Sequence, residues 1–146
     1  MARTVSDLAT RTLKHLFVKE GGEAVNAEDA DSVVVAFNAM VDGWFAAGLT
    51  PVDDETLAAA LQTALVEGTE YTLASGFPIL DRHFEGVAAM LAVSLQDDFA
   101  VDVKPSTQVM AMEGGQRLYA AYMPSMVSTI DRALRRLPET ILWPSE

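Results

Sequence analysis

Apolar residues recur at the spacing of an α-helix in four separate segments of this chain, and Gly or Pro residues lie between these segments. The pattern is clearest after Asn26, where Phe37, Met40 and Trp44 are among the repeating positions. Residues three or four positions apart lie on one face of a helix, so each segment offers an apolar face to a core. The sequence therefore predicts an all-α fold, a small bundle of helices.

The first two helices have recognisable ends. The first is predicted over residues 4–20, because Thr4 or Ser6 can accept hydrogen bonds from the free backbone amides at its start. The second is predicted between Asn26, a suitable N-cap, and Gly48, which favours the left-handed backbone that ends many helices. The apolar face of the second helix is expected to form part of the core.

The third helix is predicted over residues 81–98 and the fourth over residues 105–136. The apolar face of the third is broad, so we expect this helix to be covered on two sides. Pro105 suits the first turn of the fourth helix, whereas the glycine pair at Gly114 weakens it and Pro124 should kink it. The predicted core residues of the second and third helices are Phe37, Met40, Trp44, Phe84, Leu91 and Leu95.

The pattern is weaker in residues 52–80. A short helix is predicted over residues 53–62. The weak alternation around residues 65–74 fits either a short strand or one short β-hairpin centred on Gly68.

The last part of the chain combines arginines with an apolar tail. We predict a helical domain over residues 1–137 and an extended C-terminal arm over residues 138–146. The residues that we interpret as a docking surface are Arg132, Arg135, Arg136, Leu137, Ile141, Leu142 and Trp143. The arginines can also be explained by their favourable interaction with a helix C-terminus. Joined to the apolar tail, they suit protein docking better than DNA reading, which would require a larger basic footprint.

The charge distribution is uneven. Between Lys19 and Arg82 no Lys or Arg occurs, although those 62 residues contain twelve carboxylates. With a net charge of −11, sequence-independent binding of nucleic acid over the whole surface is disfavoured, because phosphates would be repelled. Solubility is the simpler explanation of such an acidic balance.

Catalytic and metal-binding patterns are lacking. The chain contains no Cys, and its two histidines, His15 and His83, lie on different predicted helices. We expect His15 to be solvated and His83 to lie at a helix start. The acidic groups at 53–55 and 97–98 lie where helices begin or end, so solvation explains them. We predict no catalytic residue, no metal site, no cofactor and no membrane segment.

Two runs of residues carry a resemblance to a known family. The first, at the end of the second helix, consists of Met40, Trp44, Gly48 and Leu49. The second consists of Leu91, Ala92, Leu95, Phe99 and Val101, followed by Pro105. Over residues 4–135 the chain resembles the head–tail adaptor proteins of tailed bacteriophages and gene-transfer particles, also called head-completion or packaged-DNA stabilisation proteins.

The resemblance implies a non-enzymatic structural protein of the virion, made in the host cytoplasm. Its subunits would form a ring, commonly of twelve, that extends the DNA channel beneath the portal and supports the tail. The implied partners are the portal protein, a tail or stopper protein, further copies of the chain, and double-stranded DNA that passes without specific binding. The C-terminal arm would hold the portal. The candidate acids of the channel or its rim are Asp42, Asp53, Asp54, Glu55, Glu67 and Glu70.

Two alternatives belong to other classes. A small acidic regulatory module, for example a DNA mimic, would use the same carboxylates to bind a basic DNA-binding protein. A hydrolase acting on cell wall or DNA would depend on scattered carboxylates alone.

Overall fold

The computed structural model describes residues 3–16, 25–49 and 68–122. In this part of the chain, helices are the regular elements: α1 (Val5–Leu16), α2 (Ala27–Ala46), the 3-10 helix η1 (Asp81–His83), α4 (Phe84–Leu95) and α5 (Pro105–Tyr122). No strand is present in the described residues, where one isolated antiparallel bridge joins Thr4 and Gly76. The predicted all-α character is confirmed for these residues. Residues predicted to form the short helix at 53–62, the kinked end of the fourth helix and the C-terminal arm lie outside them.

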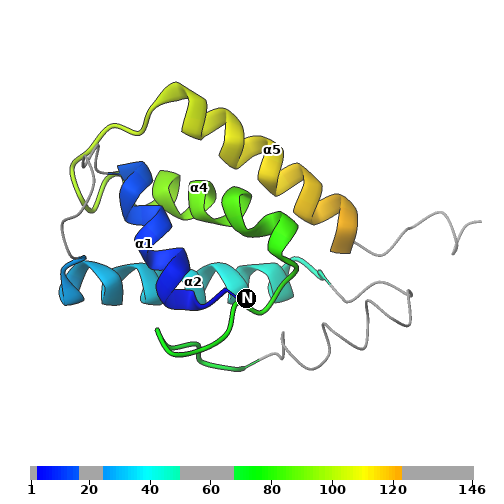
Figure 1. Cartoon of the computed structure of the whole chain (residues 1–146). Helices are drawn as coiled ribbons and strands as arrows, with labels where there is room; N and C mark the ends of the chain where they lie inside the picture. Colours follow the sequence, from blue (N-terminus) through cyan, green and yellow to red (C-terminus); the bar gives the residue numbers. More distant parts are fainter. Residues whose placement is uncertain (1–2, 17–24, 50–67, 123–146) are drawn as a thin grey trace, which may run out of the picture.

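Helix α4 is the centre of the bundle. It packs against α1, α2 and α5, and in Figure 1 it lies between α5 and α2 with α1 across the front. Its buried residues are Phe84, Val87, Ala88, Ala89, Leu91, Ala92 and Leu95. The broad apolar face in the sequence therefore corresponds to a helix that is covered on more than one side, as predicted.

Aromatic side chains fill the core between α2 and the start of α4. Phe37 is fully buried, and its ring centroid lies 5.6 Å from that of Tyr71 and 6.4 Å from that of Trp44. Phe77 continues the group and meets the ring of Phe84 edge-on at 5.2 Å. Such tilted and edge-on contacts are the favourable arrangements of aromatic rings. The other predicted core residues are also enclosed: Leu91 and Leu95 are buried, and Met40 is partly buried against the core.

The crossing of α4 and α5 depends on two glycines. A Cβ atom built on Gly114 would lie 2.5 Å from the Cα of Gly86, and one built on Gly86 would lie 2.8 Å from the Cα of Gly114. The obstructing atoms belong to the backbone, so no side-chain rotation could relieve the clash. Gly114 lowers the intrinsic stability of α5, but it also allows the two helix backbones to touch.

The ends of the first two helices follow the sequence closely. Thr4 and Asp7 form a reciprocal cap at the start of α1: the Thr4 amide donates to the Asp7 carboxylate at 2.9 Å, and the Asp7 amide donates to Thr4 Oγ1 at 3.2 Å. Asn26 caps α2 through a longer bond of 3.4 Å from the Glu28 amide. After α2, Gly48 adopts a φ of 80°, the left-handed conformation expected of a helix stop.

The predicted β-hairpin is wrong in the part that the structure describes. Residues 68–74 form turns and extended chain without a strand partner. The side chain of Asn38 on α2 takes the place of a neighbouring strand, because it accepts a hydrogen bond from the Tyr71 amide at 2.8 Å and donates one to the Tyr71 carbonyl at 3.0 Å. A single side chain thus satisfies backbone groups that would otherwise favour a β-ladder.

Candidate functional site

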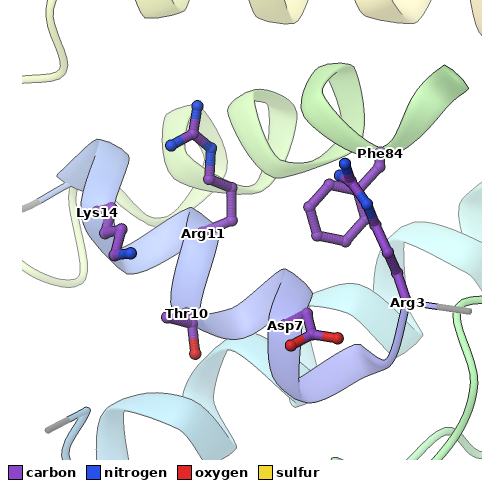
Figure 2. Close-up of a pocket in the computed structure, with 6 residues that line it drawn as sticks. All are labelled: Arg3, Asp7, Thr10, Arg11, Lys14 and Phe84. Atoms are coloured by element: carbon purple, nitrogen blue, oxygen red, sulfur yellow. The ribbon is translucent and has the colours of Figure 1, made fainter. Parts of the chain in front are cut away.

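A groove between α1 and the start of α4 is the candidate site. Its lining residues are Arg3, Asp7, Thr10, Arg11, Lys14 and Phe84, and its volume is about 250 Å³. Along α1, Asp7 is followed after three or four residues by Thr10 and Arg11, and these are followed at the same interval by Lys14, so the helix carries the four side chains on one side. Arg3 lies in the chain just before α1. Figure 2 shows Arg3 lying against the ring of Phe84, with Arg11 and Lys14 on α1, the helix that begins after Arg3. We call this feature the basic groove.

One carboxylate on α4 holds two arginines of the basic groove in place. Arg11 Nε donates to Glu85 Oε2 at 2.8 Å, and Arg3 Nη1 lies 3.8 Å from Glu85 Oε1. All three side chains are more than 40% exposed, so these ion pairs add little stability. Their main effect is to orient the guanidinium groups beside the groove.

A second contact fixes Arg3. Its guanidinium carbon lies 4.1 Å from the centre of the Phe84 ring, which is the geometry of a cation–π interaction. Phe84 is itself buried, so the ring is a rigid support. The backbone beside Arg3 is also fixed, because its carbonyl accepts a hydrogen bond from the Phe77 amide at 2.8 Å.

The basic groove is positive in a strongly negative chain. Three cationic side chains stand against two carboxylates, Asp7 and Glu85, which leaves one net positive charge. Asp7 is turned toward Thr4, whose hydrogen bonds hold the pKa of this carboxyl below its ordinary value of 3.8. Lys14 is exposed and makes no ion pair with the residues that the structure describes. The groove therefore suits an anionic partner.

His15 adjoins the groove but is not the solvated residue that the sequence suggested. Its side chain is 12% exposed, and its Nε2 lies 3.8 Å from Glu85 Oε2. Burial lowers the pKa of His15, Arg11 lowers it further, and Glu85 opposes the shift. The ring is therefore neutral at neutral pH and adds no charge to the basic groove.

His83 lies at a helix start, as predicted, but it is buried. Its ring centroid is 5.5 Å from that of Tyr122 on α5. Burial, aided by the neighbouring Arg82, lowers the pKa of His83. Like His15, it is a neutral packing residue. In the described ranges no group of three or more His, Asp or Glu side chains is arranged to hold a metal ion.

A second surface lies on the outer side of α5. Its residues Val109, Met112 and Tyr119 are 49%, 62% and 37% exposed and lie on one face of the helix, which we call the apolar stripe. The opposite face of α5 is the one that packs, and its buried residues are Thr107, Ala111, Leu118 and Tyr122. Exposed apolar residues grouped on one face are typical of protein-binding surfaces.

The predicted channel acids are only partly described. Asp42 is exposed on α2, and Glu70 is exposed in the segment before Tyr71. Asp42 shares the outer face of α2 with Glu28, Asp31 and Val35, all of which are exposed. We call these four residues the acidic face of α2. The acids at positions 53, 54, 55 and 67 and all predicted docking residues from 132 to 143 lie outside the described residues.

The basic groove was not predicted from the sequence. The spacing of Arg3, Arg11 and Lys14 was available as a signal, since all three occur within one predicted helix and its start. The ion pair between Arg11 and Glu85 was not, because it joins residues 74 positions apart. Without Glu85 and Phe84, the basic side chains resemble the solvated face of any surface helix.

Comparison with known proteins does not assign this chain to a family, so its function must be inferred from its own residues. The chain matches no protein-family model, and no curated protein is significantly similar to it. None of the helices in the described ranges has the length and hydrophobicity required to cross a membrane. The fold and the two surfaces describe a small helical protein with candidate sites for protein partners.

Proposed function

We propose that this chain is a structural, non-enzymatic head–tail adaptor of a tailed bacteriophage or a related particle. Copies of it would form a ring beneath the portal, extend the DNA channel and provide the platform for a tail or stopper protein. The resemblance of residues 4–135 to that family suggests the role, and the helical bundle is compatible with it.

The observation that carries the proposal is the apolar stripe of α5. A helix that packs on one face and exposes Val109, Met112 and Tyr119 on the other is suited to contact another protein. Full burial of one such side chain stabilises a complex by about 1.5–3 kcal/mol. We assign the portal protein as the occupant of the stripe, because α5 precedes the segment that the resemblance assigns to portal docking.

The charge of the chain supports the same role. DNA that slides through a ring must not adhere to it, and carboxylates repel phosphates. Glu70 is exposed, as a channel or rim position requires. With a net charge of −11, the assembled ring would carry a strongly negative surface.

Binding to the purified portal tests the proposal. The full chain, mixed with portal protein, is expected to form rings visible by electron microscopy on the face of the portal that receives the tail. A Val109→Asp/Met112→Asp variant should lose most of this binding, because burying two carboxylates at the contact is costly. Ser106→Asp, which adds an exposed charge to the first turn of the same helix, is the matched control and should bind normally.

Two results would contradict the proposal. One is the absence of any complex between the native chain and the portal. The other is tight, strongly salt-dependent binding of the monomer to a basic DNA-binding protein, which would favour the DNA-mimic alternative. Glu28, Asp31 and Asp42 on one face of α2 are the described residues such a mimic would use.

A further inference from the structure

We propose that the basic groove of one copy binds the acidic face of α2 on a second copy. The inference deepens the proposed function, because a ring requires two different surfaces that meet head to tail. It assigns those surfaces to residues: Arg3, Arg11 and Lys14 on one copy, and the α2 carboxylates on the next.

The spacing of the charges agrees on the two surfaces. Arg3 and Lys14 are eleven residues apart, and so are Asp31 and Asp42. At a rise of 1.5 Å per residue, Asp31 and Asp42 lie about 16 Å apart along α2. Arg3 precedes Val5, the first residue of α1, so the helical rise sets only the part of its distance to Lys14 that lies within α1. If α1 and the residues that lead into it lie beside α2 of a second copy, both pairs of opposite charge can approach each other.

The charge distribution also selects the direction of the two helices. The C-terminal end of α1 carries Arg11 and Lys14, and the N-terminal end of α2 carries Glu28 and Asp31. An antiparallel arrangement places these two ends together and leaves Arg3 opposite Asp42. Antiparallel packing also brings together helix ends of opposite partial charge. In this antiparallel arrangement, Lys14 of one copy lies opposite Asp31 of the other.

The same register places an apolar residue over the groove. Thr10 is four residues before Lys14, and Val35 is four residues after Asp31, so the two are opposite each other in an antiparallel pair. Val35 is 70% exposed although its side chain is apolar. The basic groove, with Phe84 as one wall and a volume of about 250 Å³, is large enough for a valine side chain.

The contact must join two copies. In one chain, α1 and α2 pack against each other through their buried sides, and the two charged surfaces lie on the sides that point away from this contact. A carboxylate of α2 therefore cannot reach the groove of its own chain. Each copy is left with one basic and one acidic surface, which is the arrangement that generates a ring or a filament.

The absence of cysteine allows a direct test. One variant carries Thr10→Cys and another Val35→Cys; equal amounts of the two are mixed without portal and oxidised mildly. A disulfide requires Cα atoms within about 7 Å, so only residues that meet in the complex should be linked efficiently. The expected product, identified by intact mass, is the mixed dimer, in clear excess over dimers of either variant with itself.

Charge reversal then tests the register. Adding Lys14→Glu to the Thr10→Cys variant should reduce the mixed dimer about tenfold or more, because it sets like charges opposite each other. Adding Asp31→Lys to the Val35→Cys partner should restore it. The control replaces Val35→Cys with Gln116→Cys, an exposed position on α5, and should give only background linkage. Circular dichroism verifies that each variant is folded.

Three outcomes would overturn the inference. They are equal yields with Val35→Cys and Gln116→Cys, insensitivity of the yield to Lys14→Glu, and binding of a labelled DNA duplex that Lys14→Glu abolishes. The last would assign the basic groove to nucleic acid. If portal binding persists in native chains that fail the linkage test, this inference is wrong and the adaptor proposal stands. If linkage succeeds and the portal does not bind, this inference stands and the adaptor proposal is wrong.

Discussion

Helices α4 and α5 are adjacent in the chain and cross each other, yet they are buried to very different degrees. Seven of the twelve residues of α4 are buried, against four of the eighteen in α5. Both segments show apolar residues at helical spacing. In α4 these residues meet three other helices, whereas the most prominent apolar residues of α5, Val109 and Met112, point outward. Periodicity therefore indicates a helix, but it does not indicate which face is covered.

Truncating one side chain in each helix gives the largest expected difference. Leu91→Ala in α4 should lower the free energy of unfolding by about 2–5 kcal/mol, because Leu91 is fully buried and leaves a cavity. Met112→Ala in α5 should change it by less than about 0.5 kcal/mol, since Met112 is exposed in the free chain. Chemical denaturation measures both. Similar losses would show that the apolar stripe is covered in the free protein.

The close contact between Gly86 and Gly114 is tested by two alanine substitutions that should differ in their effect on stability. Gly114→Ala should destabilise the fold by about 1–3 kcal/mol, because its Cβ would overlap the backbone at Gly86. Gly115→Ala should be neutral or stabilise by up to about 1 kcal/mol, since its Cβ would only touch the flexible Met90 side chain at 3.8 Å and alanine favours the helix. Thermal melts compare the two. Stabilisation by Gly114→Ala would contradict the close crossing.

Substitution of Asn38, which holds the segment before α4, is expected to lower the free energy of unfolding by a smaller amount. Asn38→Ala removes both hydrogen bonds to the Tyr71 backbone and should cost about 1–2 kcal/mol. Asn38→Asp keeps the acceptor for the Tyr71 amide, but it sets a second carboxylate oxygen against the Tyr71 carbonyl and should therefore also destabilise the chain. Hydrogen exchange at the Tyr71 amide, which should speed up in Asn38→Ala, separates this local effect from a general loss of stability. An unchanged exchange rate would show that Asn38 does not hold the segment.

The smallest effect concerns pH. Burial lowers the pKa of His15 beside α4 and of His83 beside α5, so the folded chain binds their protons less readily than the unfolded chain. Stability contributed by neutral histidines is complete above their ordinary pKa of 6.5 and is lost as pH falls below it. The free energy of unfolding should therefore decrease between about pH 7.5 and pH 5. A His15→Gln/His83→Gln variant should show a shallower decrease, and an equal slope would refute this cause.

Much of the local structure could be predicted from the residues. The caps at Thr4 and Asn26, the stop at Gly48 and the start at Pro105 depend on backbone preferences of single residues, and all four are present. The prediction of a hairpin around residues 65–74 was wrong for the residues that the structure describes, 68–74. Its weak alternation fits a strand, but the competing partner, Asn38, lies more than thirty residues away on a helix.

Only part of the candidate site could be predicted, because some of its residues are far apart in the sequence. The sequence supplied the basic side chains of α1, and the fold supplied Glu85 and Phe84, which orient them. The acidic face of α2 was present in the sequence as scattered carboxylates, and the exposure of Val35 between them was known only from the structure.

The sequence alone determined the helical elements, the ends set by Thr4, Asn26, Gly48 and Pro105, and the strongly negative charge, because these depend on residue type and on spacing within about two turns. The third helix was predicted over residues 81–98, but its α-helical part is shorter, Phe84–Leu95. Only the tertiary structure decided which face of α5 is covered, that Gly86 and Gly114 touch, and that Arg3 and Arg11 share one carboxylate. Those features join residues far apart in the chain. Helix packing sets their distances, and no local preference encodes them.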